Sequence, residues 1–270
     1  MPKQQIQKHR LPTPTIEITD GAAIPDPQDK RLVTAWSLAL ACAASALLII
    51  ILLRPEPYWD ILLFLRDGVI VTFKLTALGI GLTLPLGLLT GLGRLSRNRV
   101  INLVASFYVE VVRGIPLIVQ LCFIYYGLGR FIHLPDLLAA AVAMSICYGA
   151  YMGEIFRAGI SAIDKGQAEA ARSLGFNRFQ TMWLVVLPLA WRTIVPPVGN
   201  ESIALLKDTA LVSILAMTSI LQRGKEYVTS HMSPFETYAT VALLYLIITL
   251  ILSKGVSLME AKLNYYDNER

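Results

Sequence analysis

Long apolar stretches, separated by short polar segments, make up most of the chain. The first runs from Val33 to Leu53, and a helix of about 20 apolar residues is long enough to cross the hydrocarbon core of a bilayer. Such stretches predict transmembrane helices rather than the core of a soluble domain. We expect five more, at residues 69–93, 101–128, 137–157, from about 187 onward, and 238–252 with flanking residues.

Glycine and proline interrupt two of these stretches. Gly114 and Pro116 predict a kink in the third, and Pro188, Pro196 and Pro197 divide the fifth. Residues 211–221 are apolar but too short to cross as a helix, so they predict a partly inserted or externally capping helix.

Composition supports a polytopic membrane protein. Hydrophobic residues make up 55% of the chain and charged residues only 16%, and the mean hydropathy is +0.57. A soluble domain has about a quarter of its residues charged. The three cysteines lie in apolar stretches and the three histidines are scattered, so neither a disulfide framework nor a metal site is expected.

The basic residues predict the orientation. Most of the 24 Lys and Arg residues fall in the amino-terminal tail, after the second span, around residues 157–192 and near the carboxyl end. Because cytosolic segments are enriched in Lys and Arg, both termini are expected in the cytosol, with an even number of spans, about six. This distribution indicates membrane orientation, and no nucleic-acid partner is expected.

The longest polar interruption, residues 160–187, predicts a short surface helix. Residues 167–174 are rich in Ala, Glu, Arg and Leu, which favour helix. Asp164 is placed to cap its start, and Gly175 lies where helices commonly end in a left-handed residue. Ala168, Ala171 and Leu174 recur at intervals of three, which predicts a low apolar stripe for a groove on a partner.

The spacing of residues within this interruption is more specific evidence of a protein family than its composition is. Glu169-Ala170-Ala171 is followed by three residues and Gly175, then by nine residues and Val185-Val186-Leu187-Pro188. This pattern resembles the Glu-Ala-Ala signature of permease subunits in binding-protein-dependent ABC importers. The polar amino acid branch of that family is also resembled by residues 72–76, 93–97, 112–120, 149–157, 166–167, 197–201 and 206–209.

The resemblance covers about residues 66–257 and implies an all-α, type I importer core of five transmembrane helices. The stretch 33–53 would then be an extra amino-terminal helix, after a mostly disordered cytosolic tail at 1–32. Residues 258–270 are expected to form a cytosolic carboxyl-terminal tail. Within the core, residues 160–187 would be the coupling region, with Asp164, Gly166, Glu169, Ala170, Ala171, Leu174 and Gly175 as coupling residues.

The same resemblance implies the partners. They are two ABC ATPase subunits, a second permease, either identical or paralogous, and an extracytoplasmic binding protein that delivers the amino acid, all at a prokaryotic inner membrane. The chain lacks a Gly-x4-Gly-Lys-Ser/Thr phosphate loop. No catalytic residue and no bound cofactor are therefore expected here, and ATP and Mg²⁺ would belong to the ATPase subunits.

Ionisable residues in apolar spans are the candidates for the translocation path. Each costs about 3 kcal/mol in a membrane on insertion scales, so each must face protein, water or a partner. The alternative is pairing within the chain, as between Lys207 and Asp208 or Glu201, or between Arg113 and Glu110. The candidates are the ionisable Glu110, Arg113, Glu154, Glu201, Lys207 and Asp208, together with their polar neighbours Asn200 and Thr209.

Other functions stay open at this point. Opines or related amino acid derivatives are alternative substrates for such a permease. A self-contained secondary transporter would need no ATPase, and would tolerate a charge reversal at Glu169. No Ser/His, paired Asp or His-Glu-x-x-His arrangement within the spans indicates an intramembrane enzyme.

Overall fold

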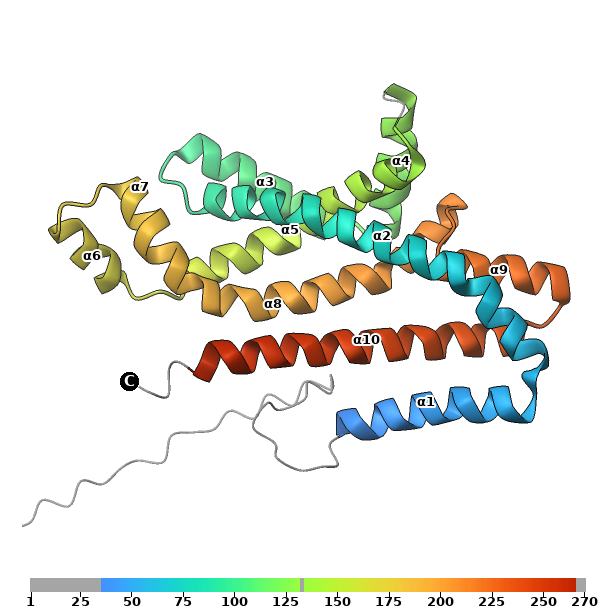
Figure 1. Cartoon of the computed structure of the whole chain (residues 1–270). Coiled ribbons are helices and arrows are strands. Elements are labelled where there is room, and N and C mark those ends of the chain that lie inside the picture. Colours follow the sequence, from blue (N-terminus) through green and yellow to red (C-terminus); the bar gives the residue numbers. More distant parts are fainter. Residues whose placement is uncertain (1–34, 132–133, 266–270) are drawn as a thin grey trace, which may run out of the picture.

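The computed structural model of the chain describes residues 35–131 and 134–265, which fold into helices with no β-strand among them (Figure 1). Five segments are long and apolar enough to cross a bilayer: α1 (Ala35–Leu53), α2 (Pro55–Arg94), α5 (Asp136–Ser161), the run Arg178–Leu215 and α10 (Pro234–Tyr265). The bent pair α3 (Arg99–Gly114) and α4 (Leu117–Phe131) makes a sixth if it is counted as one span. The all-α, polytopic fold class is thus confirmed, and the count of six is approximate.

The break between α3 and α4 confirms the kink expected at Gly114–Pro116. The two helices are bent by 111°. Ile115 is extended, as the residue before a proline tends to be. The buried Gln120 side chain donates hydrogen bonds to Val112 O (2.5 Å) and Ile115 O (2.6 Å). It thereby satisfies carbonyl groups that the break would leave without partners.

Close packing of α2 on α5 forms the centre of the fold. Gly87 and Gly91 of α2 face Met152, Gly153 and Phe156 of α5, and a Cβ at Gly91 would lie 2.8 Å from Gly153 O. Small residues allow the two backbones to approach, as they do between membrane helices in general. Glycines of the second and fourth spans therefore lie at the contact between these two helices.

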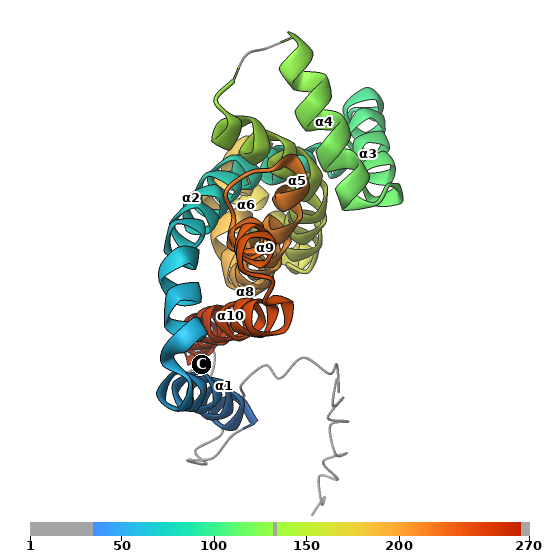
Figure 2. The same cartoon turned by 90° about the vertical axis from the view of Figure 1, so that its right-hand side faces the viewer.

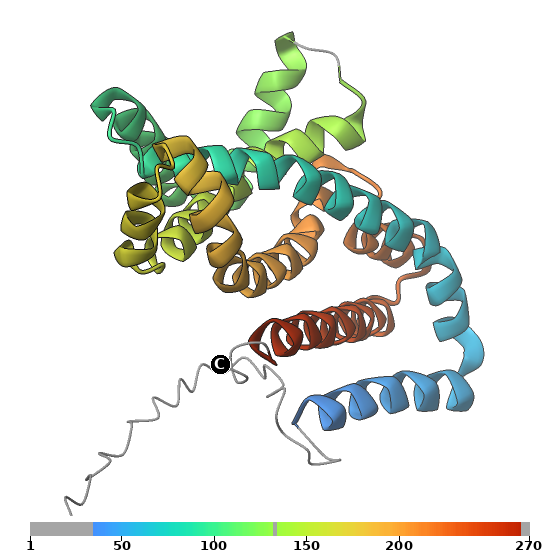
Figure 3. The same ribbon diagram turned by 60° about the vertical axis from the view of Figure 1, so that its left-hand side comes forward.

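The remaining helices pack around this pair in a fixed order. Viewed along α8 (Leu187–Asp208), α10 lies between α8 and α1, and α2 curves around one side of all three (Figure 2). The helix α1 is joined to α10 by the Trp36 indole, which donates to Leu250 O at 2.8 Å and lies under the Lys254 ammonium. The short helix α6 (Lys165–Ser173) and the helix α9 (Ile220–His231) occupy opposite ends of α8 (Figures 1 and 3).

Several helix boundaries differ from those that hydropathy predicts. Residues 55–67, which lie between the first two predicted spans, are the first turns of α2. The fifth span begins at Arg178, through α7 (Arg178–Gln180) and the π-helix η1 (Thr181–Val186), rather than near Leu187. The helix α10 continues to Tyr265, into the segment expected as a tail from 258. Hydropathy marks where a helix leaves hydrocarbon, whereas the helix itself ends only where its hydrogen bonding ends.

The single capping helix predicted at 211–221 is wrong. A 3-10 helix, η2 (Thr209–Leu215), ends at Ala216 in the left-handed conformation, and α9 begins only at Ile220, where Ser219 caps its start. Two contacts fix α9 to α2: Arg223 pairs with Asp67 at 3.3 Å, and Ile220 N donates to Thr72 Oγ1 at 3.2 Å. The tail at 1–32, His133 and residues 266–270 lie outside the described residues.

Candidate functional site

The helix α6 has the two capped ends that the sequence predicts. Asp164 Oδ1 accepts a hydrogen bond from Gly166 N at 2.6 Å. At the other end, Gly175 has a φ of 93°, Gly175 N donates to Arg172 O, and Phe176 N donates to Ala171 O. These two bonds form a Schellman motif, which requires a residue that tolerates the left-handed region. A nine-residue helix that would be marginal alone is thereby held at both ends.

The orientation of α6 corrects the predicted partner-facing stripe. Ala171 is only 4% exposed and Ala168 packs against the cluster around Met152 and Phe156, so both alanines face their own chain. The contact surface for this stripe is supplied by η1 and by the apolar cluster around Met152 and Phe156, a contact that sequence spacing does not reveal. Leu174, by contrast, is 80% exposed, and Glu169 and Ala170 are also on the surface.

A second capping device fixes the chain after α6. Asn177 Oδ1 accepts from Gln180 N and Gln180 Oε1 accepts from Asn177 N, both at 2.9 Å, which is a capping box. Phe179 follows on α7, is 70% exposed, and lies 5.8 Å from the Trp183 ring. The end of the molecule at α6 and α7 thus exposes apolar side chains beside charges of both signs, among them Lys165, Glu169, Arg172 and Arg178.

A polar cluster lies among the membrane-spanning helices. The Tyr148 hydroxyl on α5 donates to Asp208 Oδ2 on α8 at 2.6 Å. Glu201 precedes Asp208 by two helix turns, so the two carboxylates lie on the same face of α8. An ionisable residue at membrane depth must lie against other protein groups or water, and the contact of Asp208 with Tyr148 meets this requirement.

Arg113 brings a positive charge to this cluster from the break between α3 and α4. Its guanidinium carbon lies 5.7 Å from the centre of the Tyr151 ring, within range of a cation–π interaction. Arg113 also interacts electrostatically with Glu201 and with Glu154. Carboxylates from α8 and a guanidinium from the break are therefore opposed across the tyrosines of α5, an arrangement that complements the two charges of a zwitterion.

The other path candidates lie elsewhere. Lys207 and Asn200 are exposed and share a face of α8 next to that of Glu201 and Asp208, and Glu110 is exposed on α3. The Thr209 hydroxyl is buried and donates to Leu206 O at 2.6 Å, within its own chain segment. The intrachain pairs weighed from sequence, Lys207 with Asp208 or Glu201 and Glu110 with Arg113, do not form as ion pairs among the residues that the structure describes.

Glu154 belongs to a separate ion cluster. It accepts hydrogen bonds from Arg94 at the end of α2 and from Arg157 one turn along α5, the latter at 3.0 Å between Oε2 and Nη2. Both partners of Glu154 lie in segments that the sequence motifs marked. The pairing of Glu154 with Arg94, 60 residues away in the chain, was not predicted. In this structure the carboxylate of Glu154 ties α2 to α5 close to α6.

Three side chains at these sites were missed at the sequence level. Tyr148, Tyr151 and Gln120 are uncharged, whereas the sequence criterion rested on ionisable residues in apolar spans and on the polar residues next to them, Asn200 and Thr209. Tyr151 and Gln120 fall within the quoted motifs 149–157 and 112–120, and Tyr148 directly precedes the first of these. The signal that would have found them is a polar group on the glycine-rich face of a span.

Comparison with known proteins identifies the family. The family described as "binding-protein-dependent transport system inner membrane component" matches residues 83–264, which is more than half of the chain. The chain belongs to this family. The ABC importer permease that the Glu-Ala-Ala spacing resembles is therefore confirmed, and the protein is a multi-pass component of the inner membrane.

Curated relatives of this inner membrane component are named for amino acid transport. The glutamine transport system permease protein GlnP of Escherichia coli strain K12 is 37% identical over 198 residues, which cover 72% of this chain and 90% of the relative. The probable amino-acid permease protein YxeN of Bacillus subtilis strain 168 is 37% identical over 62% of this chain and 76% of the relative. Both agree with the branch of the family that the sequence motifs indicate.

Solved structures of similar fold include an amino acid ABC transporter with histidines. That chain is 40% identical, has a TM-score of 0.68, and the match covers 74% of this chain and 94% of that chain. The MetNI methionine ABC transporter in an inward-facing conformation is 22% identical with a TM-score of 0.65, and this similarity supports the fold alone. Importer permeases of this family work with ATPase and binding-protein partners in general, so the chain is a transport subunit.

Proposed function

We propose that this permease carries polar amino acids through the inner membrane, driven by ATP hydrolysis on partner subunits that bind α6. The observation that carries this proposal is the rigid turn at α6, capped at both ends and packed through Ala171, with Glu169 and Leu174 on its surface. A docked partner that moved this element would also move η1, against which it packs. Movement of the ATPase subunits would therefore reach the spans directly.

The proposed path runs along the polar face of α8. Glu201 and Asp208 would attract the substrate ammonium group, and Arg113 would attract its carboxylate. The exposed Asn200 and Lys207 would extend this face toward a second permease. In an alternating-access cycle, ATP must bind one conformation better than the other to shift their populations.

The proposed assembly has two permeases, two ATPase subunits and an extracytoplasmic binding protein. The asymmetry of Lys and Arg residues supports both termini, and α6, on the cytosolic side. The names of the relatives support glutamine or another polar amino acid as substrate. ATP and Mg²⁺ would be held by the ATPase subunits alone.

Affinity purification from native membranes tests the coupling proposal. Tagged wild-type permease should retain ATPase subunits in mild detergent, whereas Glu169→Lys and Leu174→Asp should lose them. The first reverses the charge of an exposed side chain at α6, and the second adds a charge to an exposed apolar one. Glu56→Lys is the matched control, since Glu56 is exposed on the first turn of α2. Its ATPase content should equal that of wild type.

Reconstituted proteoliposomes distinguish the remaining possibilities. With binding protein and internal ATP, uptake of a polar amino acid should require ATP, and uptake of an opine in its place would redefine the substrate. Uptake without ATP, undiminished in Glu169→Lys, would instead establish a secondary transporter and refute the coupling proposal.

A further inference from the structure

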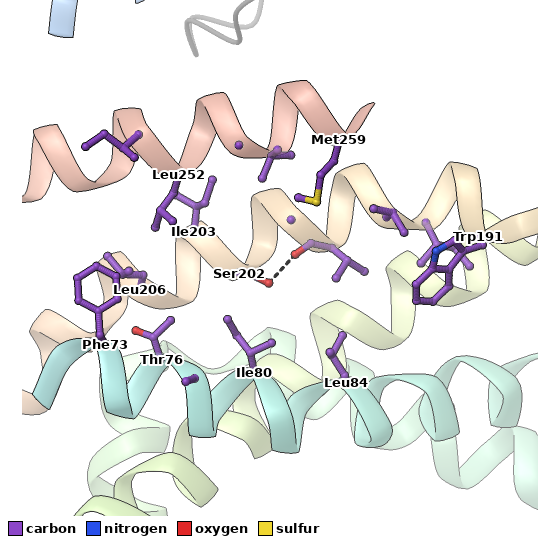
Figure 4. Close-up of a pocket in the computed structure, with 18 of the residues that line it drawn as sticks. Phe73, Thr76, Ile80, Leu84, Trp191, Ser202, Ile203, Leu206, Leu252 and Met259 are labelled. Carbon is purple, nitrogen blue, oxygen red and sulfur yellow. Dashed lines mark hydrogen bonds between the residues drawn. The ribbon is translucent and has the colours of Figure 1, made fainter. Parts of the chain in front are cut away.

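An apolar groove with a volume of about 800 Å³ lies on the side of α8 that faces α2 and α10 (Figure 4). Phe73, Thr76 and Ile80 of α2 form one wall, and Leu252 and Met259 of α10 form the other (Figure 4). A smaller apolar pocket of about 370 Å³ shares Leu84, Phe156 and Trp191 with it. The apolar surface therefore continues along α8 into η1.

The groove offers little hydrogen bonding to a polar ligand. Its two hydroxyl side chains already donate within their own helices, Thr76 to Thr72 O at 2.8 Å and Ser202 to Val198 O at 2.7 Å. All its other lining residues have apolar side chains or are glycine, apart from the Trp191 indole at one end. An amino acid would have to leave its charges without partners there, at a cost of several kcal/mol. The groove is thus suited to hydrocarbon and not to the transported solute.

The position of the groove argues against a protein occupant. Ser202 and Leu206 face the groove, whereas Glu201 and Asp208 point to another side of α8, so a second permease that completes the polar path would leave the groove uncovered. The chain's own α1 packs beside α10 through Trp36 and contributes no residue to the lining. A surface of a membrane-spanning bundle that no protein covers faces the hydrocarbon of the bilayer.

One end of the groove has features that suit a phospholipid headgroup. Trp191, 57% exposed, lies there, and tryptophan is enriched at the interface between bilayer and water. The exposed Lys262 follows Met259 by three residues and Gly255 by seven, which places it on the same side of α10 just beyond the lining. Its ammonium group is complementary to a phosphate.

We propose that this groove binds a membrane phospholipid, with acyl chain in the groove and phosphate near Lys262. The inference goes beyond the proposed transport function and requires only that the helices span a bilayer. A bound acyl chain would fill the space between α2, α8 and α10 and hold these helices together by apolar burial.

Native mass spectrometry of the complex, extracted in mild detergent, tests this site with Gly255→Phe. A Cβ at Gly255 meets nothing within 4 Å, so phenylalanine can enter the groove without displacing backbone. Gly81→Phe is the matched control, because its Cβ also meets nothing within 4 Å and Gly81 does not line the groove. Wild type and Gly81→Phe should retain phospholipid through detergent exchange, and Gly255→Phe should lose it at least fivefold.

Two further measurements complete the test. Lys262→Gln should weaken retention about threefold, the size of one exposed charge pair. A phospholipid with a photoreactive acyl chain should label residues 251–259 of the wild-type protein. This measurement does not depend on whether any variant folds. Equal phospholipid in Gly255→Phe and Gly81→Phe, or labelling confined to other segments, would overturn the proposal. Loss of the second permease from Gly255→Phe alone would show that the groove is a protein interface instead.

Discussion

The hydroxyl of Tyr148 and the carboxylate of Asp208 are joined at 2.6 Å, although 60 residues separate them in the chain. This bond connects α5, which packs on α2 and leads into α6, with the carboxyl end of α8. A single contact therefore relates the proposed solute path to the helix that precedes the proposed coupling element. Its removal is the most direct test of whether the cluster serves transport.

Tyr148→Phe should lower kcat/KM for amino acid uptake about tenfold. The ring stays in place, but Asp208 loses a hydrogen bond, and one to a charged group contributes about 1.5–3 kcal/mol. The measurement is ATP-dependent uptake in proteoliposomes at several solute concentrations. Tyr126→Phe, which removes a hydroxyl from a 62% exposed ring, is the control and should match wild type. Unchanged uptake in Tyr148→Phe would remove this bond from the mechanism.

Gly91→Ala should lower the melting temperature of the purified permease. The added Cβ would lie 2.8 Å from Gly153 O and from Phe156 Cβ, so α2 and α5 must separate, and overpacking of this kind typically costs about 1–3 kcal/mol. In Gly81→Ala the Cβ meets no neighbour, and alanine favours the helix by about 0.5–1 kcal/mol over glycine. A melting temperature equal in both variants would contradict the close packing.

Arg94→Gln and Glu154→Gln should not destabilise the permease additively. Their side chains are 18% and 22% exposed, so a double-mutant cycle on the free energy of unfolding should give a coupling of about 1 kcal/mol. If Glu154 were instead a solute contact, Glu154→Gln would reduce uptake while Arg94→Gln would not. A coupling energy of zero would show that the pair contributes nothing to stability.

Gly175→Val should uncouple ATP hydrolysis from transport, whereas Gly175→Asn should retain most coupling. At a φ of 93°, a β-branched residue is strained, while asparagine tolerates the left-handed region comparatively well. Strain there would be relieved by unwinding the last turn of α6. The measurement is the ATPase rate of the complex with and without loaded binding protein. Equal stimulation in both variants would mean that the shape of this turn does not matter.

The ends of α6 and the break between α3 and α4 were predictable from sequence because their causes are local. Asp164 as a cap, Gly175 as a left-handed end and the break at Gly114–Pro116 follow from properties of single residues and their neighbours. Hydropathy likewise identified the apolar spans but not their ends, as α2 and α10 show. It also missed α9, which has charged residues and packs on α2 near Gly68.

The sequence by itself determined a polytopic helical membrane protein with the Glu-Ala-Ala signature of its family, because apolar length and residue spacing are properties of the chain alone. Only the tertiary structure decided that Ala171 faces η1, that Glu154 pairs with Arg94, and that Tyr148 holds Asp208. These contacts join residues from different helices. Which side of each helix meets which neighbour depends on close packing of many side chains at once, as at Gly91 and Gly153, and no local pattern specifies it.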